Sequence, residues 1–119
     1  MKPTKEQVLA EPAGRQMDAC VAEIIFSYED MGFEISPRYQ KPTDHGVEVL
    51  YDLPHYSTEI AAAWEVVEKM REKYGFLLTD ETPWIAELID CDFLRITGEA
   101  ETAPLAICRA SLLSVLQEH

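Results

Sequence analysis

The sequence predicts a single α+β domain spanning residues 1–119, built from helices and an antiparallel sheet of three to four strands. Three observations lead to this prediction. Apolar residues recur at three- and four-residue steps in three segments, as they do in amphipathic helices. Short β-rich runs follow one another with few residues between them, which favours antiparallel hairpins. The composition, 47% hydrophobic and 27% charged, suits one folded core in a chain of 119 residues.

Two helices are expected before the first sheet segment. Thr4 and Gln7 have the spacing of a capping box, so a short helix should begin there and end before Pro12. A longer helix should run over residues 15–31 and end at Gly32. Its apolar stripe consists of Met17, Cys20, Val21, Ile24, Tyr28 and Met31.

Residues 33–56 carry a weaker pattern because prolines and glycines interrupt them. Residues 42–46 are typical of a turn. Apolar side chains then alternate with Glu48 in residues 47–51, which indicates a short strand at a sheet edge.

The segment Leu-Pro-His-Tyr-Ser-Thr-Glu, residues 53–59, is interpreted as a helix start. Ser57 or Thr58 can accept a hydrogen bond from an amide of the first turn, and Glu59 suits the positive end of the helix dipole. The helix should continue to about residue 73 and bury an apolar stripe made of Ile60, Ala63, Trp64, Val67, Met70 and Tyr74. If the cap moved aside, the same helix start could hold an anion.

Three further strands and a helix are expected in the C-terminal half, at residues 76–79, 84–89, 93–97 and 103–117. Thr102 should cap the helix. The helix is so apolar that we expect it to be buried or to form an oligomer contact. In the middle strand, alternation predicts two opposite faces: Trp84, Ala86 and Leu88 on one side, and Ile85, Glu87 and Ile89 on the other.

Composition excludes several functional classes. The formal net charge of -12 opposes binding to phosphate backbones, so nucleic acid is not an expected partner. The final helix offers Arg109 alone, which also argues against double-stranded RNA binding. No apolar run is long enough to span a bilayer, and no signal peptide is recognised. Three scattered cysteines favour reduced thiols in a cytoplasm.

The chemistry-bearing residues do not assemble into a known catalytic motif. His55 and Ser57 invite a nucleophile–base interpretation, but spacing fixes no orienting acid, so catalysis is disfavoured. No metal-ligand spacing or phosphate-binding loop is present, and no cofactor is expected. Trp64 should be buried, whereas Trp84 could project from the end of the sheet. Arg109 should pair with a carboxylate (Glu23, Glu65 or Glu87) or bind an anion.

Three segments resemble the phage ABA-sandwich domain, a family of small proteins from phages and prophages, mostly of Gram-positive bacteria. They are residues 12–23, the Pro-His-Tyr-Ser-Thr-Glu-Ile stretch with its tryptophan helix at 54–69, and 103–110. Met17 and Cys20 stand where leucines are usual. The resemblance implies a sheet sandwiched between helices in α/β/α layers, a phage origin and no known catalytic residue.

These observations lead to a functional hypothesis. The chain is expected to be a non-catalytic, homo-oligomeric accessory protein that binds a basic host or phage protein in the host cytoplasm and interferes with a host system. The alternative is a sponge for a small nucleotide signal; a DNA mimic and a weak enzyme are less favoured. The candidate ligand-binding residues are His55, Tyr56, Ser57, Thr58, Trp84 and Arg109.

Overall fold

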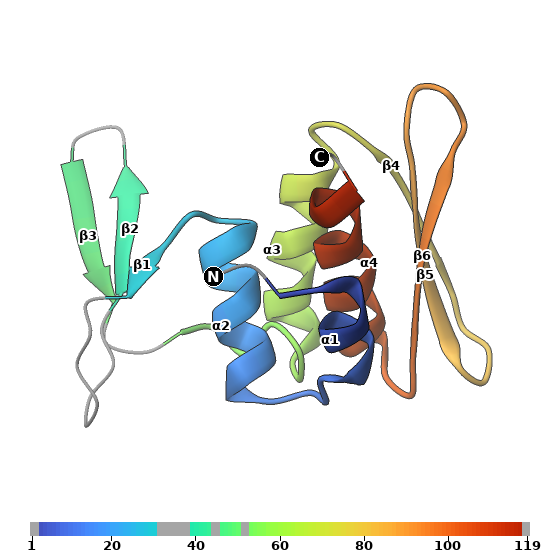
Figure 1. Ribbon diagram of the computed structural model, residues 1–119, viewed down its shortest axis with the longest axis horizontal. Helices are drawn as coiled ribbons and strands as arrows, with labels where there is room; N and C mark the ends of the chain where they lie inside the picture. The colour runs from blue at the N-terminus through green and yellow to red at the C-terminus, as the bar shows by residue number, and fades with distance from the viewer. Residues whose placement is uncertain (1–2, 31–38, 44–45, 51–52, 118–119) are drawn as a thin grey trace.

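A computed structural model of the chain describes residues 3–30, 39–43, 46–50 and 53–117 (Figure 1). Four helices are present in these residues: α1 (Lys5–Ala10), α2 (Arg15–Ile24), α3 (Ile60–Met70) and α4 (Ala103–Gln117). The described strands form two antiparallel sheets. The first comprises β1 (Glu29–Asp30), β2 (Tyr39–Thr43) and β3 (Gly46–Leu50), and the second comprises β4 (Gly75–Thr79), β5 (Trp84–Ile89) and β6 (Arg95–Ala100).

The centre of the molecule is α4, which lies between the β4–β6 sheet and the other helices (Figure 1). Residues 103–114 are buried except Arg109, which is half-buried. The prediction of a buried final helix is therefore confirmed, and its apolar faces are covered within the chain. Gly98 on β6 allows close contact, because a Cβ there would lie 2.4 Å from the backbone nitrogen of Ala110.

The β4–β6 sheet is built from two consecutive hairpins, as predicted. The middle strand has the predicted bounds, and Ala86 and Leu88 are buried against α4. The third strand begins at Arg95 rather than at residue 93, because residues 90–94 form a turn. In that turn Phe93 has a φ of 62°, outside the range of a strand.

The α+β class and the three-stranded antiparallel sheet packed against helices are confirmed. All the described helices lie on one side of β4–β6 (Figure 1). On the other face of this sheet, side chains of β6 are exposed at alternate positions from Arg95 to Glu99. Within the described residues, that second face carries no helix.

The N-terminal region differs in part from the prediction. The capping box between Thr4 and Gln7 and the helix it starts are confirmed. The next helix ends at Ile24, however, and the expectation that it continues to residue 31 is wrong. Ser27 has a φ of 60°, and the Tyr28 amide donates to the carbonyl of Ala22, so the chain turns out of the helix before β1.

The first sheet lies beyond α2, away from β4–β6 (Figure 1). Its edge strand β3 confirms the strand expected near residues 47–51. Its middle strand β2 was not expected, because Pro42 interrupts the pattern; in the structure Pro42 is paired in register with Val47. The remaining expectations for residues 31–38, 44–45 and 51–52 lie outside the described residues.

The third helix begins later than predicted, and its buried face confirms Ala63, Val67 and Met70 of the predicted stripe but not Ile60 or Trp64. Its N-cap is Glu59, and it ends at Met70. Its buried positions are Ala63, Val66, Val67 and Met70. The expectation that Trp64 is buried is wrong: it is 42% exposed, and Ile60 is 51% exposed. None of the helices in the described part of the chain has the length and hydropathy needed to cross a membrane.

Candidate functional site

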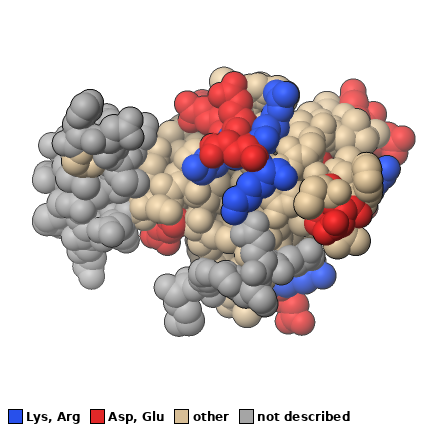
Figure 2. Space-filling model, turned by 90° about the horizontal axis from the view of Figure 1, so that it is seen from above, with Lys and Arg blue, Asp and Glu red and all other residues tan. Residues whose placement is uncertain are grey.

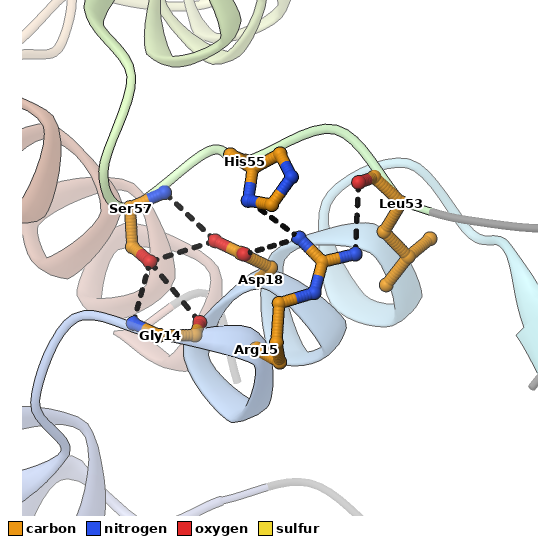
Figure 3. Close-up of polar contacts among 6 residues, drawn as sticks. All are labelled: Gly14, Arg15, Asp18, Leu53, His55 and Ser57. Atoms are coloured by element: carbon orange, nitrogen blue, oxygen red, sulfur yellow. Dashed lines mark hydrogen bonds and ion pairs between the residues drawn. The ribbon is translucent and has the colours of Figure 1, made fainter.

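The most developed polar cluster joins the start of α2 to the segment before α3 (Figure 3). Its centre is Asp18, whose side chain is fully buried. One carboxylate oxygen accepts the backbone N–H of Ser57 at 2.8 Å and lies 2.7 Å from the Ser57 Oγ. The other oxygen accepts from the Arg15 guanidinium at 2.8 Å. The buried carboxylate is thus paired and hydrogen-bonded, as burial of a charge requires.

Arg15 connects this carboxylate to the chain before α3. Its guanidinium also donates to the carbonyl of Leu53 at 2.9 Å and lies 3.0 Å from Nδ1 of His55 (Figure 3). Because a guanidinium only donates, Nδ1 of His55 is the acceptor in this contact.

The side chain of Ser57 forms hydrogen bonds at the beginning of α2 and does not cap α3. The Gly14 amide donates to the Ser57 Oγ at 2.9 Å, and Gly14 is the N-cap of α2, with a φ of 154° that favours glycine. The N-cap of α3 is Glu59, without a side-chain hydrogen bond, and Thr58 is exposed. The prediction that Ser57 or Thr58 caps α3 is therefore wrong.

This arrangement does not support nucleophilic catalysis at Ser57. Its hydroxyl is fully buried, and the two acceptors within reach of its proton are the Asp18 carboxylate at 2.7 Å and the Gly14 carbonyl at 3.1 Å. The imidazole of His55 faces Arg15 instead. A serine nucleophile requires access to substrate and a base that takes its proton. We conclude that the Asp18–Ser57 cluster, made of Gly14, Arg15, Asp18, Leu53, His55 and Ser57, holds α2 against the segment before α3.

Tyr56 lies in the core, and its side chain is 1% exposed. Its ring stacks on Phe26 with 5.3 Å between centroids and an interplanar angle of 18°. Burial, followed by its hydrogen bond with Tyr28, raises the pKa of the Tyr56 hydroxyl well above its usual range. In this conformation the ring is not a surface on which a ligand could stack.

The remaining two candidates make separate contacts. Trp84 is half-buried and packs against the core. Arg109 donates to the backbone carbonyls of Glu99 at 2.8 Å and Glu11 at 3.1 Å, and not to the carboxylates expected from the sequence. Its buried Nε has no hydrogen-bond partner in the structure. Among the described residues, no hydrogen bond or ring contact joins Trp84 or Arg109 to residues 55–58.

A groove of about 440 Å³ lies between α1 and α2, and its lining includes Val8, Met17 and Leu112. Its described lining contains no lysine or arginine but does include Glu11, which does not suit a phosphate group. Cys20 also lines it, and burial, with smaller effects of nearby carboxylates, raises the pKa of this thiol. All three cysteines are free, as expected, and no group of three potential metal ligands was found among the described residues.

Sequence reasoning missed Gly14, Arg15 and Asp18 as partners of the 53–57 segment. One signal could have found Asp18: it is a carboxylate inside the buried stripe of α2, between Met17 and Val21. A buried charge needs partners, so this position already indicated a polar contact with another segment.

Comparison with known proteins agrees with the resemblance in the sequence. The model of the phage ABA sandwich domain family matches residues 19–112 of the chain. The chain belongs to this family. The match covers Ser57 but begins immediately after Asp18.

A solved structure is similar to this phage ABA sandwich domain over most of both chains. It is the 2.0 Å crystal structure of a phage protein from Bacillus cereus ATCC 14579, with a TM-score of 0.62 and 29% sequence identity. The similarity covers 87% of this chain and 86% of that one. A comparison with curated proteins gave no match.

Proposed function

We propose that this phage ABA sandwich domain is a non-catalytic binding module, made by a phage or prophage, that binds a protein with a basic surface in the host cytoplasm. By binding that protein, the domain would interfere with a host system. The observation that carries the proposal is the exposed Trp64 on α3. The phage protein of Bacillus cereus, similar in fold, supports the phage origin.

The solvent face of α3 has the features of a protein-binding surface. Trp64 and Ile60 are four residues apart, so they lie one above the other on the helix, and both are about half exposed. The ring of Trp64 meets Phe76 edge to face, with 5.9 Å between centroids. This contact holds the indole in place while leaving part of it open, as in the aromatic anchors of protein interfaces.

Charge near this surface is mixed, since Lys69 and Arg71 are exposed beside it, so the net charge of the whole chain is what favours a basic partner. Glu65 and Glu68 are exposed on the same helix, and Glu59 is exposed at its start. Figure 2 shows acidic and basic side chains side by side over part of the molecule, but the whole chain carries a net charge of -12. A basic partner would be attracted by this field, whereas an acidic one would be repelled.

The test is partner capture from a bacterial lysate by cross-linking and mass spectrometry, followed by affinity measurement with the captured protein. Trp64→Ala should weaken binding by at least tenfold, because buried tryptophans are frequent hot spots. Leu9→Ala, which also truncates a partly exposed apolar side chain on a helix, is the control. Binding should also weaken as salt rises. An affinity that is insensitive to both Trp64→Ala and salt would contradict the proposal.

A nucleotide sponge remains the second candidate because one observation favours it. The N-terminus of α3 has no side-chain cap, so the amides of its first turn are open to an anion. Calorimetry with a panel of cyclic and linear nucleotides tests this directly. Thr58→Asp should abolish binding at this helix start by placing a carboxylate there, whereas Trp64→Ala should have little effect. Tight nucleotide binding with this pattern would place the sponge first.

A further inference from the structure

The second face of the β4–β6 sheet is a regular surface that the described helices leave open (Figure 1). The strand register arranges its side chains in three rows across the sheet. The first row is Gly75, Ile89 and Arg95; the second is Leu77, Glu87 and Thr97; the third is Thr79, Ile85 and Glu99. Three aliphatic side chains therefore surround Glu87: Leu77 lies directly opposite on β4, and Ile85 and Ile89 lie on either side along β5.

Charge in this face is partly neutralised, unlike the strongly acidic chain as a whole. Arg95 pairs with Glu87 at 3.2 Å, and the Glu87 side chain is only 18% exposed. Glu99 stands two rows from Arg95 on the same strand. The face thus presents a cation at one end of β6 and an acid at the other.

The adjoining β5–β6 turn carries two further exposed apolar side chains. Phe93 is 85% exposed and Leu94 is 64% exposed. Asp90 holds the turn: its carboxylate accepts the amides of Asp92 and Leu94, and its carbonyl accepts the amide of Phe93. These bonds keep Phe93 in a left-handed conformation that is unfavourable for an aromatic residue and leave its ring in solvent.

We propose that this face, together with the β5–β6 turn, binds a second copy of the chain face to face in a two-fold symmetric dimer. A two-fold axis along the second row exchanges the first row with the third. Ile89 then lies opposite Ile85 of the second copy, and Arg95 lies opposite Glu99 of the second copy. Each of these two contacts occurs twice, as an isologous interface requires. Side chains of the second row meet their own copies on the axis, where the ion pair with Arg95 reduces the repulsion between the two Glu87 carboxylates. Two copies that each carry a net charge of -12 repel one another at long range, so the Arg95–Glu99 pairs and the apolar contacts must outweigh this repulsion.

The size of the surface sets the strength of the dimer. Three strands about 4.8 Å apart, with five residues at about 3.4 Å each, cover roughly 250 Å² in projection. A standard stable interface buries about 800 Å² on each partner. The flat face is therefore too small alone, and Phe93 and Leu94 must contribute. We expect a weak dimer with a dissociation constant of micromolar order. The interface is distinct from the α3 surface and does not depend on the function proposed above.

Sedimentation equilibrium of the full chain, at about 5 to 500 µM and near-physiological salt, is the test. The wild type should shift from monomer to dimer over this range. Leu77→Glu should weaken the dimer at least tenfold, while the control Leu9→Glu should not; both leucines are 46% exposed. A monomer at every concentration, or equal effects of the two variants, would overturn the proposal. Circular dichroism confirms that each variant is folded.

A charge exchange tests the pairing itself. Arg95→Glu alone and Glu99→Arg alone should each be monomeric, because each homodimer would then hold two like-charge contacts. An equimolar mixture should dimerise, because the heterodimer restores an opposite-charge contact at both ends. Absence of a heterodimer from the mixture, when the wild type dimerises, would refute this arrangement. Phe93→Asn should weaken the dimer while raising the melting temperature of the monomer, since asparagine tolerates a positive φ.

Discussion

Replacing Asp18 with asparagine should destabilise the fold by about 3 kcal/mol. The carboxylate interacts with the backbone N–H and the hydroxyl of Ser57 and with Arg15. An asparagine keeps one acceptor oxygen and turns an NH2 group toward a donor. A buried hydrogen bond to a charged group contributes about 1.5–3 kcal/mol, and a buried donor left unpaired costs about 1–3 kcal/mol. The Arg15 side chain is 45% exposed, so water can replace that contact at a cost of at most about 1 kcal/mol.

Urea denaturation distinguishes this tertiary cluster from a local helix cap. Ser57→Ala should cost about 1–2 kcal/mol, because the Asp18 carboxylate and the Gly14 amide each lose a partner. Thr58→Ala should change stability by less than about 0.5 kcal/mol, since Thr58 is exposed. A double-mutant cycle between Asp18 and Ser57 should give a coupling of at least about 1 kcal/mol. Equal losses for Ser57→Ala and Thr58→Ala, or no coupling, would refute the reasoning.

Three other perturbations have defined outcomes. Gly98→Ala should cost about 3 kcal/mol in a denaturant melt, because its Cβ would lie 2.4 Å from the α4 backbone; an unchanged midpoint would mean that β6 and α4 are not in contact. Phe93→Asn should stabilise the monomer by about 0.5–1 kcal/mol by relieving its positive φ, as differential scanning calorimetry at low concentration can show. In thiol labelling of the native protein, exposed Cys91 should react first. Cys20 should follow slowly, since burial raises the pKa of its thiol and leaves less thiolate at a given pH, and buried Cys108, whose pKa is also raised by burial, should react only on unfolding.

The elements that the sequence predicted best are those set by local pattern. The middle strand and the last helix have the predicted bounds, at residues 84–89 and 103–117. In the strand, alternation alone assigns each side chain to a face. In the helix, a long apolar run needs burial whatever its orientation. Neither inference depends on knowing what the element contacts.

The orientation of α3 could not be predicted in the same way. The predicted stripe and the buried face share Ala63, Val67 and Met70. They differ at the edges, because Ile60 and Trp64 lie on one side of these shared positions and Val66 lies on the other, so periodicity fits either choice. The structure buries Val66 and exposes Ile60 and Trp64. Which stripe is buried depends on where α4 and the sheet lie, and that information is not local to the helix.

The role of residues 53–59 could not be predicted for the same reason: it depends on contacts with residues that are distant in sequence. A histidine, a serine and an aspartate do meet in the structure, but the serine bonds directly to Asp18 and the histidine faces Arg15 (Figure 3). Ser57 lies 39 residues from Asp18 in sequence, so no short motif could reveal the contact. The types of residue suggest catalysis, but in the structure the imidazole contacts Arg15 rather than the serine hydroxyl, and that hydroxyl is fully buried. Function in this part of the chain must therefore be sought on its exposed surfaces rather than in its polar cluster.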